Sequence, residues 1–259
     1  MFEYTKVMSL PRMLRLIAAS LILSATVGQR ATAEPQTIEG PATQVQLVEL
    51  FTSEGCSSCP PADAFLGALE RDPGLWQRFA PIGLHVDYWD ELGWPDRFAR
   101  ALYSERQRHY VKLCRARDVY TPGFFLDGRE WRGWFEHRGL PASKGATVGS
   151  LRLVVDGTSV SVDTRATGLS SHAKQLHVAL LGVGLTSRVR GGENGGRTLQ
   201  HAFVALSTAD APFVGGSGKL TLAAPGTHEM PRRTAVVAWV TADGDPTPLQ
   251  VVGGWLPNA

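Results

Sequence analysis

The sequence predicts an α/β domain over residues 34–140 and an all-β, sandwich-like domain over residues 150–259. Apolar, strand-like runs alternate with helix-forming stretches from Val45 to Trp134, and this alternation is typical of a layered α/β structure. After residue 150, short strand-like runs follow one another with turn signals and no convincing helix. Residues 138–150, rich in Gly, Pro, Ala, Ser and Lys, indicate a linker.

The first strand is predicted at Val45–Phe51 and the first helix at about residues 60–70. An apolar stripe at helical spacing gives this helix an inward face: Ala62, Phe65, Leu66 and Leu69. Pro60 and Pro61 fit a first helical turn, because N–H groups there have no intrahelical acceptor. Ser58 is the predicted N-cap.

The next elements are a strand at Ile82–Tyr88 and a long helix at about residues 96–117. A third strand at residues 123–126 turns at Asp127-Gly128 into residues 130–134, and an Asp-Gly pair between apolar strands is a strong hairpin signal. Further strands are predicted at residues 151–155, 160–163, 176–183, 202–206, 220–223, 235–241 and 251–256.

The N-terminus has the pattern of an export signal. Three basic side chains precede an apolar run at residues 16–27, and Ala31-Thr32-Ala33 supplies the small-x-small pattern of a cleavage site. The run is shorter than the about 20 residues of a spanning helix, and an uncleaved anchor is the alternative. We expect a signal peptide over residues 1–33 and a periplasmic or secreted protein from near Glu34, without stable membrane insertion after cleavage.

The charge is nearly balanced, with 26 basic and 24 acidic residues, and gives no reason to expect a nucleic-acid partner. The chain has three cysteines. In an exported compartment, a close pair of cysteines is oxidised unless a donor reduces it. Cys114 has no partner near it in sequence and is predicted to be a small buried hydrophobe, with a part in thiol exchange as the alternative.

The motif Cys56-Ser57-Ser58-Cys59 lies between the first strand and the first helix. Unpaired N–H groups at the start of a helix favour a thiolate at the first sulfur. A thiolate attacks disulfides, so we expect redox exchange in which an exposed Cys56 attacks and a covered Cys59 resolves the mixed disulfide. The alternatives are a structural disulfide and half of a metal site, although zinc normally takes four ligands.

Thr121-Pro122 is the second predicted element of the site. An X–Pro bond is cis in only about 5–6% of cases in folded proteins, so trans is favoured for Pro122 taken alone. Its context favours cis, because Pro122 opens a strand expected beside the first strand. A cis bond there would turn the backbone of Thr121 towards the Cys56 sulfur and offer it to an extended, thiol-bearing peptide.

Several polar and aromatic residues extend the predicted site. Glu49, in mid-strand, is a candidate to move the proton of the resolving thiol, with a hydrogen-bonded structural acid as the alternative. His85, Asp87 and Asp90 follow a strand end, where α/β sheets form sites, and with the cysteines they could hold copper or zinc. A satisfied core histidine is the alternative for His85.

Two tryptophans and a glycine-rich segment are further candidates for the site. Trp89 and Trp94 are predicted to cover the thiol pair or to bind a peptide. Residues 190–197 are rich in glycine and charge but lack the sequence of a phosphate-binding loop. We interpret them as a long hairpin loop, with a partner-binding loop at a domain interface as the alternative.

The order of strand, Cys-x-x-Cys, helix and a later proline before an apolar strand resembles the thioredoxin superfamily. The resemblance implies a thioredoxin-like N-terminal domain, a nucleophilic Cys56, a resolving Cys59 and a cis Pro122. Gly55 departs from the superfamily, where an aromatic residue is common before the first cysteine.

A closer resemblance is to the exported bacterial family called domain of unknown function 1223. The residues that carry it are Val48–Asp63, His85–Asp90, Gly93-Trp94, Asp96, Tyr120-Thr121-Pro122 and Gly192-Glu193-Asn194. This resemblance implies a thioredoxin-like fold and an exported location, without an established substrate.

Together, these features predict an exported thiol–disulfide oxidoreductase that acts on protein or peptide thiols and disulfides. Attack by Cys56 and release by Cys59, with the mixed disulfide held against Thr121-Pro122, require no cofactor. The competing interpretation is a copper-binding or copper-delivery protein that uses the same cysteines with His85. A third is a non-catalytic binding module in which the cysteine pair is a staple.

Overall fold

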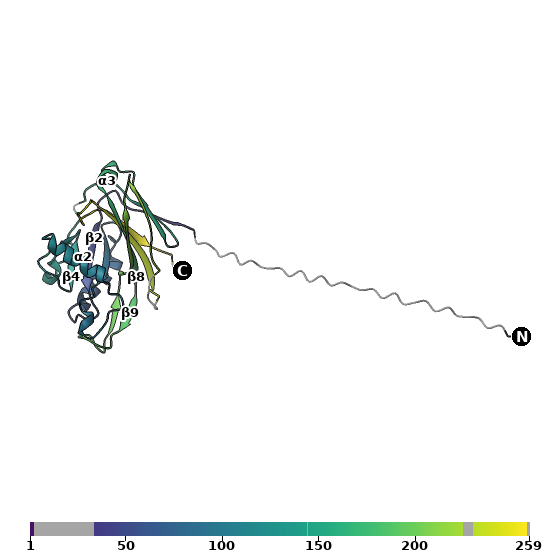
Figure 1. Ribbon diagram of the computed structural model, residues 1–259, viewed down its shortest axis with the longest axis horizontal. Helices are drawn as coiled ribbons and strands as arrows, with labels where there is room; N and C mark the ends of the chain where they lie inside the picture. The colour runs from purple at the N-terminus through teal and green to yellow at the C-terminus, as the bar shows by residue number, and fades with distance from the viewer. Residues whose placement is uncertain (3–33, 144, 225–229, 258–259) are drawn as a thin grey trace. The chain divides into compact units, whose positions relative to one another are not determined.

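An eight-stranded mixed sheet takes strands from both the N-terminal and the C-terminal parts of the chain (Figure 1). The computed structural model describes residues 1–2, 34–143, 145–224 and 230–257. The predicted signal peptide therefore lies, apart from its first two residues, outside the described residues. In spatial order the sheet contains β14 (Pro248–Trp255), β13 (Arg233–Thr241), β8 (Gln175–Val183), β11 (Val204–Pro212), β3 (Phe79–His85), β2 (Gln46–Thr52), β4 (Gly123–Leu126) and β5 (Arg129–Glu130).

Two smaller sheets complete the β structure. The four-stranded sheet has the order β1 (Gln36–Glu39), β6 (Arg152–Asp156), β7 (Ser159–Asp163) and β12 (Ser217–Thr221). Its inward residues share a buried core with alternate residues of β13: Leu153, Val160, Val162, Val236, Ala238 and Val240. The two-stranded sheet pairs β9 (Leu185–Arg188) with β10 (Thr198–His201). In Figure 1, β9 lies at the opposite end of the molecule from α3 (Thr167–His172).

The predicted thioredoxin-like α/β domain is wrong. The described residues form fourteen strands in three sheets and only three α-helices, so the protein is mostly β-sheet. The strands of the N-terminal part do not form a sheet of their own. At the edge of β3, Gly83 donates to the carbonyl of Phe203 over 2.8 Å and pairs with Val204 of β11, which continues the sheet into β8, β13 and β14.

Local predictions around β2 agree with the structure. β2, β4 and the Asp127-Gly128 hairpin form close to their predicted positions, and α1 (Pro60–Ala68) begins at Pro60. β3 spans Phe79–His85, three residues earlier than the predicted Ile82–Tyr88. The second helix is shorter than predicted, since α2 spans only Ala101–Lys112. The side chain of Asp96 accepts the backbone N–H groups of Glu54 and Phe98, which holds the segment before α2 in a loop.

The two helices next to β2 contact opposite faces of the sheet. Phe65 of α1 meets the ring of Phe124 edge to face, with centroids 5.5 Å apart, whereas Tyr110 of α2 stacks on Phe125 at 4.9 Å. Because side chains of successive strand residues point to opposite faces, α1 and α2 lie on different sides of β4 and β2. Cover on both sides explains why β2 is almost entirely buried.

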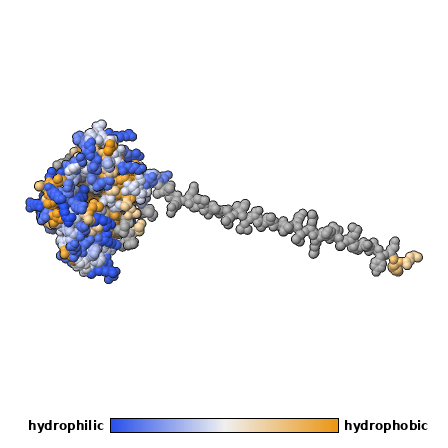
Figure 2. Space-filling model, viewed as in Figure 1, coloured by the Kyte–Doolittle hydropathy of each residue, from blue (hydrophilic) through white to orange (hydrophobic). Residues whose placement is uncertain are grey.

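Hydrophilic and hydrophobic residues are mixed over the face of the molecule in Figure 2. None of the helices formed by the described residues is long and apolar enough to cross a bilayer.

Candidate functional site

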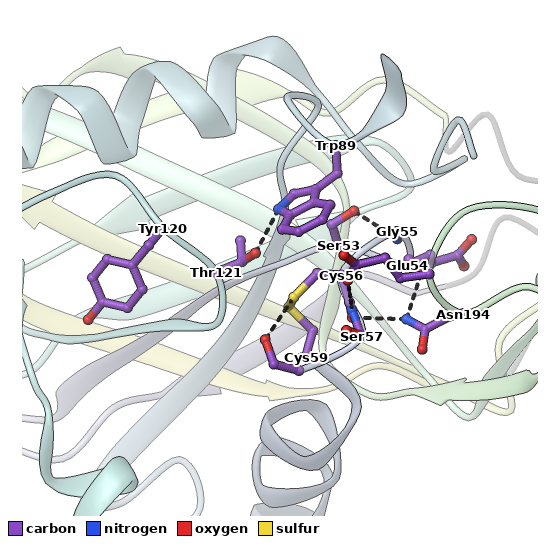
Figure 3. Close-up of a disulfide and its surroundings, with 12 residues drawn as sticks. Ser53, Glu54, Gly55, Cys56, Ser57, Cys59, Trp89, Tyr120, Thr121 and Asn194 are labelled. Carbon is purple, nitrogen blue, oxygen red and sulfur yellow. Dashed lines mark hydrogen bonds between the residues drawn. A yellow bond between two sulfur atoms is a disulfide. The ribbon is translucent and has the colours of Figure 1, made fainter. Parts of the chain in front are cut away.

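A disulfide joins Cys56 to Cys59 in the loop between β2 and α1 (Figure 3). Their Cα atoms are 5.4 Å apart. β2 ends at Thr52, and Cys59 occupies the N-cap position of α1, so the pair lies between strand and helix as predicted. Ser58 does not cap the helix. Its hydroxyl oxygen lies 3.3 Å from the sulfur of Cys56 instead.

Both cysteines are buried in this oxidised state, which differs from the prediction of an exposed Cys56. Cys56 is 1% exposed and Cys59 0% exposed, whereas Ser57 and Ser58 between them face the solvent. The loop therefore presents its two serines and turns its sulfurs inwards. Exchange with a substrate requires a side chain beside the disulfide to move.

Trp89 is placed to be that side chain, and it lies beside the disulfide in Figure 3. Its Cβ would be only 3.2 Å from a Cβ added to Gly55, the residue before Cys56, so the two residues are in close contact. The indole Nε1 donates to the hydroxyl of Thr121 over 2.7 Å. That Trp89 and Trp94 cover the pair or bind a peptide stays a prediction, and Nε1 of Trp94 donates to Glu54.

The Thr121–Pro122 bond is cis, as predicted. Gly123, the next residue, pairs with Phe51 in the antiparallel ladder of β4 and β2. Thr121-Pro122 therefore lies at the same end of β2 as the cysteine loop, and Trp89 connects the two segments.

Glu49 is not brought to the cysteines. Its two carboxylate oxygens accept hydrogen bonds from Nε of Arg106, at 2.6 Å, and from the hydroxyl of Tyr110, at 2.8 Å. Both partners belong to α2, on the other side of the sheet from α1. These contacts favour the role of a hydrogen-bonded structural acid over that of a proton carrier.

Glu54 forms a buried polar cluster behind the loop. One of its carboxylate oxygens accepts from Nε1 of Trp94 over 2.7 Å. The other is 3.1 Å from Nε2 of His201, an ion-pair distance at which the two atoms lack hydrogen-bond geometry. Burial raises the pKa of Glu54, but contacts with His201, Ser187 and Trp94 outweigh it and hold the pKa below its ordinary value.

His85 and Asp96 form a second buried pair. Nδ1 of His85 lies 2.6 Å from Oδ2 of Asp96. Burial alone would lower the pKa of His85, but the charge and hydrogen bond of Asp96 raise it to about 8. Burial likewise opposes ionisation of Asp96, yet His85 holds the pKa of this carboxyl below its ordinary value.

The predicted metal ligands have protein partners. His85 is bound to Asp96, Asp87 accepts from the hydroxyl of Ser104, and Asp90 accepts from the backbone N–H of Asp96. Within the part of the chain that the structure describes, no group of three or more His, Cys, Asp or Glu side chains is arranged to hold a metal ion.

The loop between β9 and β10 reaches the cysteine loop, a contact that the sequence analysis missed. Asn194 is fully buried, and its Nδ2 donates to the carbonyl oxygens of Glu54 and Cys56, each at 2.9 Å. A carboxylate oxygen of Glu193 accepts the backbone N–H of Ser57, also at 2.9 Å. The predicted long hairpin loop is confirmed, and its polar residues fix the backbone around Cys56.

Glycines allow this loop to approach. A Cβ added to Gly191 would lie 2.3 Å from the carbonyl oxygen of Gly93, and Gly192 has a φ of +65°. The sequence signal for the contact was the glycine-flanked Glu193-Asn194 pair. Glycine-rich composition alone indicates a turn equally well, so it does not predict this contact.

The third cysteine differs from its prediction. Cys114 is exposed and free, not buried. It follows the end of α2 with a φ of +55°, and this left-handed turn ends the helix before the position where it was predicted to end.

The chain belongs to the family described as protein of unknown function DUF1223, whose model matches residues 47–241. None of the curated proteins compared with the chain matches it. The crystal structure of protein AGR_C_4864 from Agrobacterium tumefaciens is similar, with 24% identity, coverage of 84% of this chain and 94% of that chain, and a TM-score of 0.52. HBP35 of Porphyromonas gingivalis is 13% identical, covers 85% of this chain and 77% of its own, and gives a TM-score of 0.56. At these identities, the similarity concerns the fold alone.

Proposed function

We propose that the protein is a thiol–disulfide oxidoreductase that acts on protein or peptide substrates. The observation that carries this proposal is the Cys56–Cys59 bond at the junction of β2 and α1. The Ser58 hydroxyl, 3.3 Å from the Cys56 sulfur, can donate a hydrogen bond to that sulfur when it is a thiolate. Cys56 is therefore assigned as the attacking cysteine and Cys59 as the resolving one.

In the reducing direction, the Cys56 thiolate attacks one sulfur of a substrate disulfide and forms a mixed disulfide. The other substrate sulfur leaves as a thiolate and takes up a proton. The Cys59 thiolate then attacks the Cys56 sulfur, which releases the second substrate thiol and leaves the pair oxidised. Two electrons pass to the substrate, and a dithiol donor restores the reduced pair. In the oxidising direction, a substrate dithiol attacks the Cys56–Cys59 bond and the same steps run in reverse.

Substrate access requires Trp89 to leave the disulfide. The indole nitrogen is held by one hydrogen bond, to Thr121, and the ring is only partly buried. A net contribution of about 0.5–1.5 kcal/mol is typical of one such hydrogen bond. An extended peptide that displaces the indole would meet the freed hydroxyl of Thr121 next to the sulfurs.

We place this activity in an exported compartment, periplasmic or secreted. The support is the export pattern of residues 1–33 in the sequence, together with a disulfide of the kind that persists in oxidising compartments. Mass spectrometry of the protein recovered from the periplasm or medium tests the proposal. A mature N-terminus near Glu34 is expected, and retention of the uncleaved protein in the cytosol contradicts it.

Trapping with single-cysteine variants tests the chemistry. Cys59→Ser should accumulate mixed disulfides with peptides that contain a disulfide, because the resolving thiol is absent, whereas Cys56→Ser should form none. Cys114→Ser in both backgrounds removes the exposed third thiol. Equal trapping by the two variants, or none by either, contradicts the assignment.

A structural staple in a binding module is the second candidate, and the burial of both sulfurs favours it. A staple predicts a reduction potential below about −300 mV and no rapid exchange. The potential of the pair, measured against glutathione or dithiothreitol, separates the two functions. The copper-delivery alternative has no comparable support, because His85 is engaged by Asp96.

A further inference from the structure

We propose that Glu193 opposes formation of a thiolate at Cys56 and thereby couples the β9–β10 loop to the redox state of the cysteine pair. This inference rests on the proposed function, because it concerns how that same pair is controlled. It makes Glu193 a positioning residue that acts through the backbone of Ser57 and not on a substrate.

Few backbone hydrogen-bond donors are free around the Cys56 sulfur. Amides at the start of a helix normally stabilise a thiolate there. In this protein the amide of Ser57 donates to Glu193 over 2.9 Å, and that of Cys59 donates to the carbonyl of Cys56 over 3.2 Å. Pro60 and Pro61 have no N–H to offer. The first turn of α1 therefore has few donors left for a negative sulfur.

The charge of Glu193 also disfavours a thiolate at Cys56. The Glu193 carboxylate binds the residue directly after Cys56, so a thiolate at Cys56 adds a negative charge close to one already present. The side chain is fully exposed, and the hydrogen bonds from Ser57 lower the pKa of Glu193, which keeps the carboxylate ionised at neutral pH. The repulsion is absent when the pair is a disulfide.

Other charged groups around the loop have partners of opposite charge or hydrogen-bond donors. Glu54 faces His201 and Trp94, and Asp96 faces His85. Arg197, on the same hairpin as Glu193, donates to Oδ1 of Asn194. Asp63 of α1 is half-buried, and its partial removal from water raises its pKa, while His201 and His85 oppose that rise. Among the described residues, Glu193 forms no ion pair.

Coupling of this kind is reciprocal. If the carboxylate on Ser57 disfavours the thiolate, the thiolate must weaken the binding of the Glu193 carboxylate to Ser57 by the same factor. Reduction therefore loosens the β9–β10 loop from the cysteine loop, while the two hydrogen bonds from Asn194 limit how far it separates. The oxidised pair favours the docked loop.

The test is the variant Glu193→Gln, which keeps the size and a hydrogen-bond acceptor of the side chain but removes its charge. Glu105→Gln is the matched control, because Glu105 is an exposed acid on α2, on the other side of the sheet. In a Cys59→Ser, Cys114→Ser background, the absorbance of the thiolate near 240 nm gives the titration of Cys56 alone. Glu193→Gln should raise the acid dissociation constant of the Cys56 thiol at least threefold, and Glu105→Gln should leave this constant unchanged.

Two readouts in the protein with both active-site cysteines complete the test. In Glu193→Gln, the equilibrium constant for reduction of the pair by glutathione should rise at least threefold, in favour of the dithiol. A tenfold change in this constant corresponds to 29.6 mV in reduction potential. Hydrogen–deuterium exchange of residues 190–197 should be faster in the reduced wild type than in the oxidised wild type, and this difference should shrink in Glu193→Gln. Equal titrations in Glu193→Gln and Glu105→Gln overturn the inference.

These measurements need no protein substrate, so they separate the inference from the proposed function. A wild type that never exchanges with peptide disulfides contradicts the oxidoreductase, even if the Glu193→Gln titration shifts as expected. Rapid exchange together with an unshifted titration supports the oxidoreductase and overturns the role of Glu193.

Discussion

Asn194 donates from Nδ2 to the carbonyl oxygen of Cys56 over 2.9 Å, although 138 residues separate the two in sequence. The same nitrogen donates to the carbonyl of Glu54, and the side-chain oxygen of Asn194 accepts from Arg197. Asn194 is fully buried, so water does not replace these bonds. One amide side chain thus connects the β9–β10 hairpin to the backbone around the first cysteine.

Asn194→Ala should destabilise the protein strongly. The buried carbonyl of Glu54 loses its donor at about 1–3 kcal/mol, and the carbonyl of Cys56 loses one of its two donors and keeps the N–H of Cys59, so we expect a loss of about 2–4 kcal/mol in the free energy of unfolding. Urea denaturation with the disulfide intact measures it. Glu193→Gln, on the neighbouring exposed side chain, should change stability by less than about 0.5 kcal/mol. A similar, small effect of both variants would show that the hairpin contributes little to the loop.

The β2–α1 segment could be predicted because its signals are local. The apolar run, the cysteines and the two prolines follow one another within a few residues, and each restricts the backbone where it stands. Thr121-Pro122 could be predicted for a similar reason, since it directly precedes an apolar strand.

The sheet could not be predicted in the same way. Whether β3 is an edge strand depends on β11, and the register of that contact is a single residue pair, Gly83 with Val204. No local pattern around Gly83 indicates a partner so distant in the chain. The face on which Glu49 lies depends on which helix covers which side of β2, and a strand pattern that is apolar on both sides does not encode this.

Stability should fall as the pH rises from about 6.5 to above 8. The pKa of His85 is raised from its ordinary 6.5 to about 8, so its contact with Asp96 contributes fully below pH 6.5 and is lost as the pH passes 8. A shift of this size corresponds to about 2 kcal/mol. Urea denaturation at a series of pH values measures it.

The control for this pH dependence is a histidine substitution elsewhere. His85→Gln should flatten the profile between pH 6 and 9, besides lowering stability, whereas His109→Gln, at an exposed position on α2, should leave its shape unchanged. If His85→Gln keeps the slope of the wild type, another group causes the pH dependence.

Glu49→Gln should affect stability and leave the thiol chemistry unchanged. Glu49 is 0% exposed, and removing its charge leaves Arg106 without its partner. Breaking a buried ion pair in this way costs about 3–5 kcal/mol. Thermal unfolding measures the loss. The thiolate titration and the rate of mixed-disulfide resolution should match the wild type, and a slower resolution would restore Glu49 as the proton carrier of Cys59.

Trp89→Ala should speed up reduction of the disulfide. The Cβ of Trp89 lies close to Gly55, and its indole, held by Thr121, lies beside the disulfide in Figure 3, so we expect its removal to open a path to sulfurs that are almost fully buried. We expect the second-order rate constant for reduction by dithiothreitol to rise at least fivefold.

Trp89→Phe keeps an aromatic ring without the hydrogen bond to Thr121 and should give a smaller increase. Thr121→Val, which removes only the acceptor, should resemble Trp89→Phe. Equal rates in all four proteins would mean that another motion exposes the pair, and that Trp89 does not control access to Cys56.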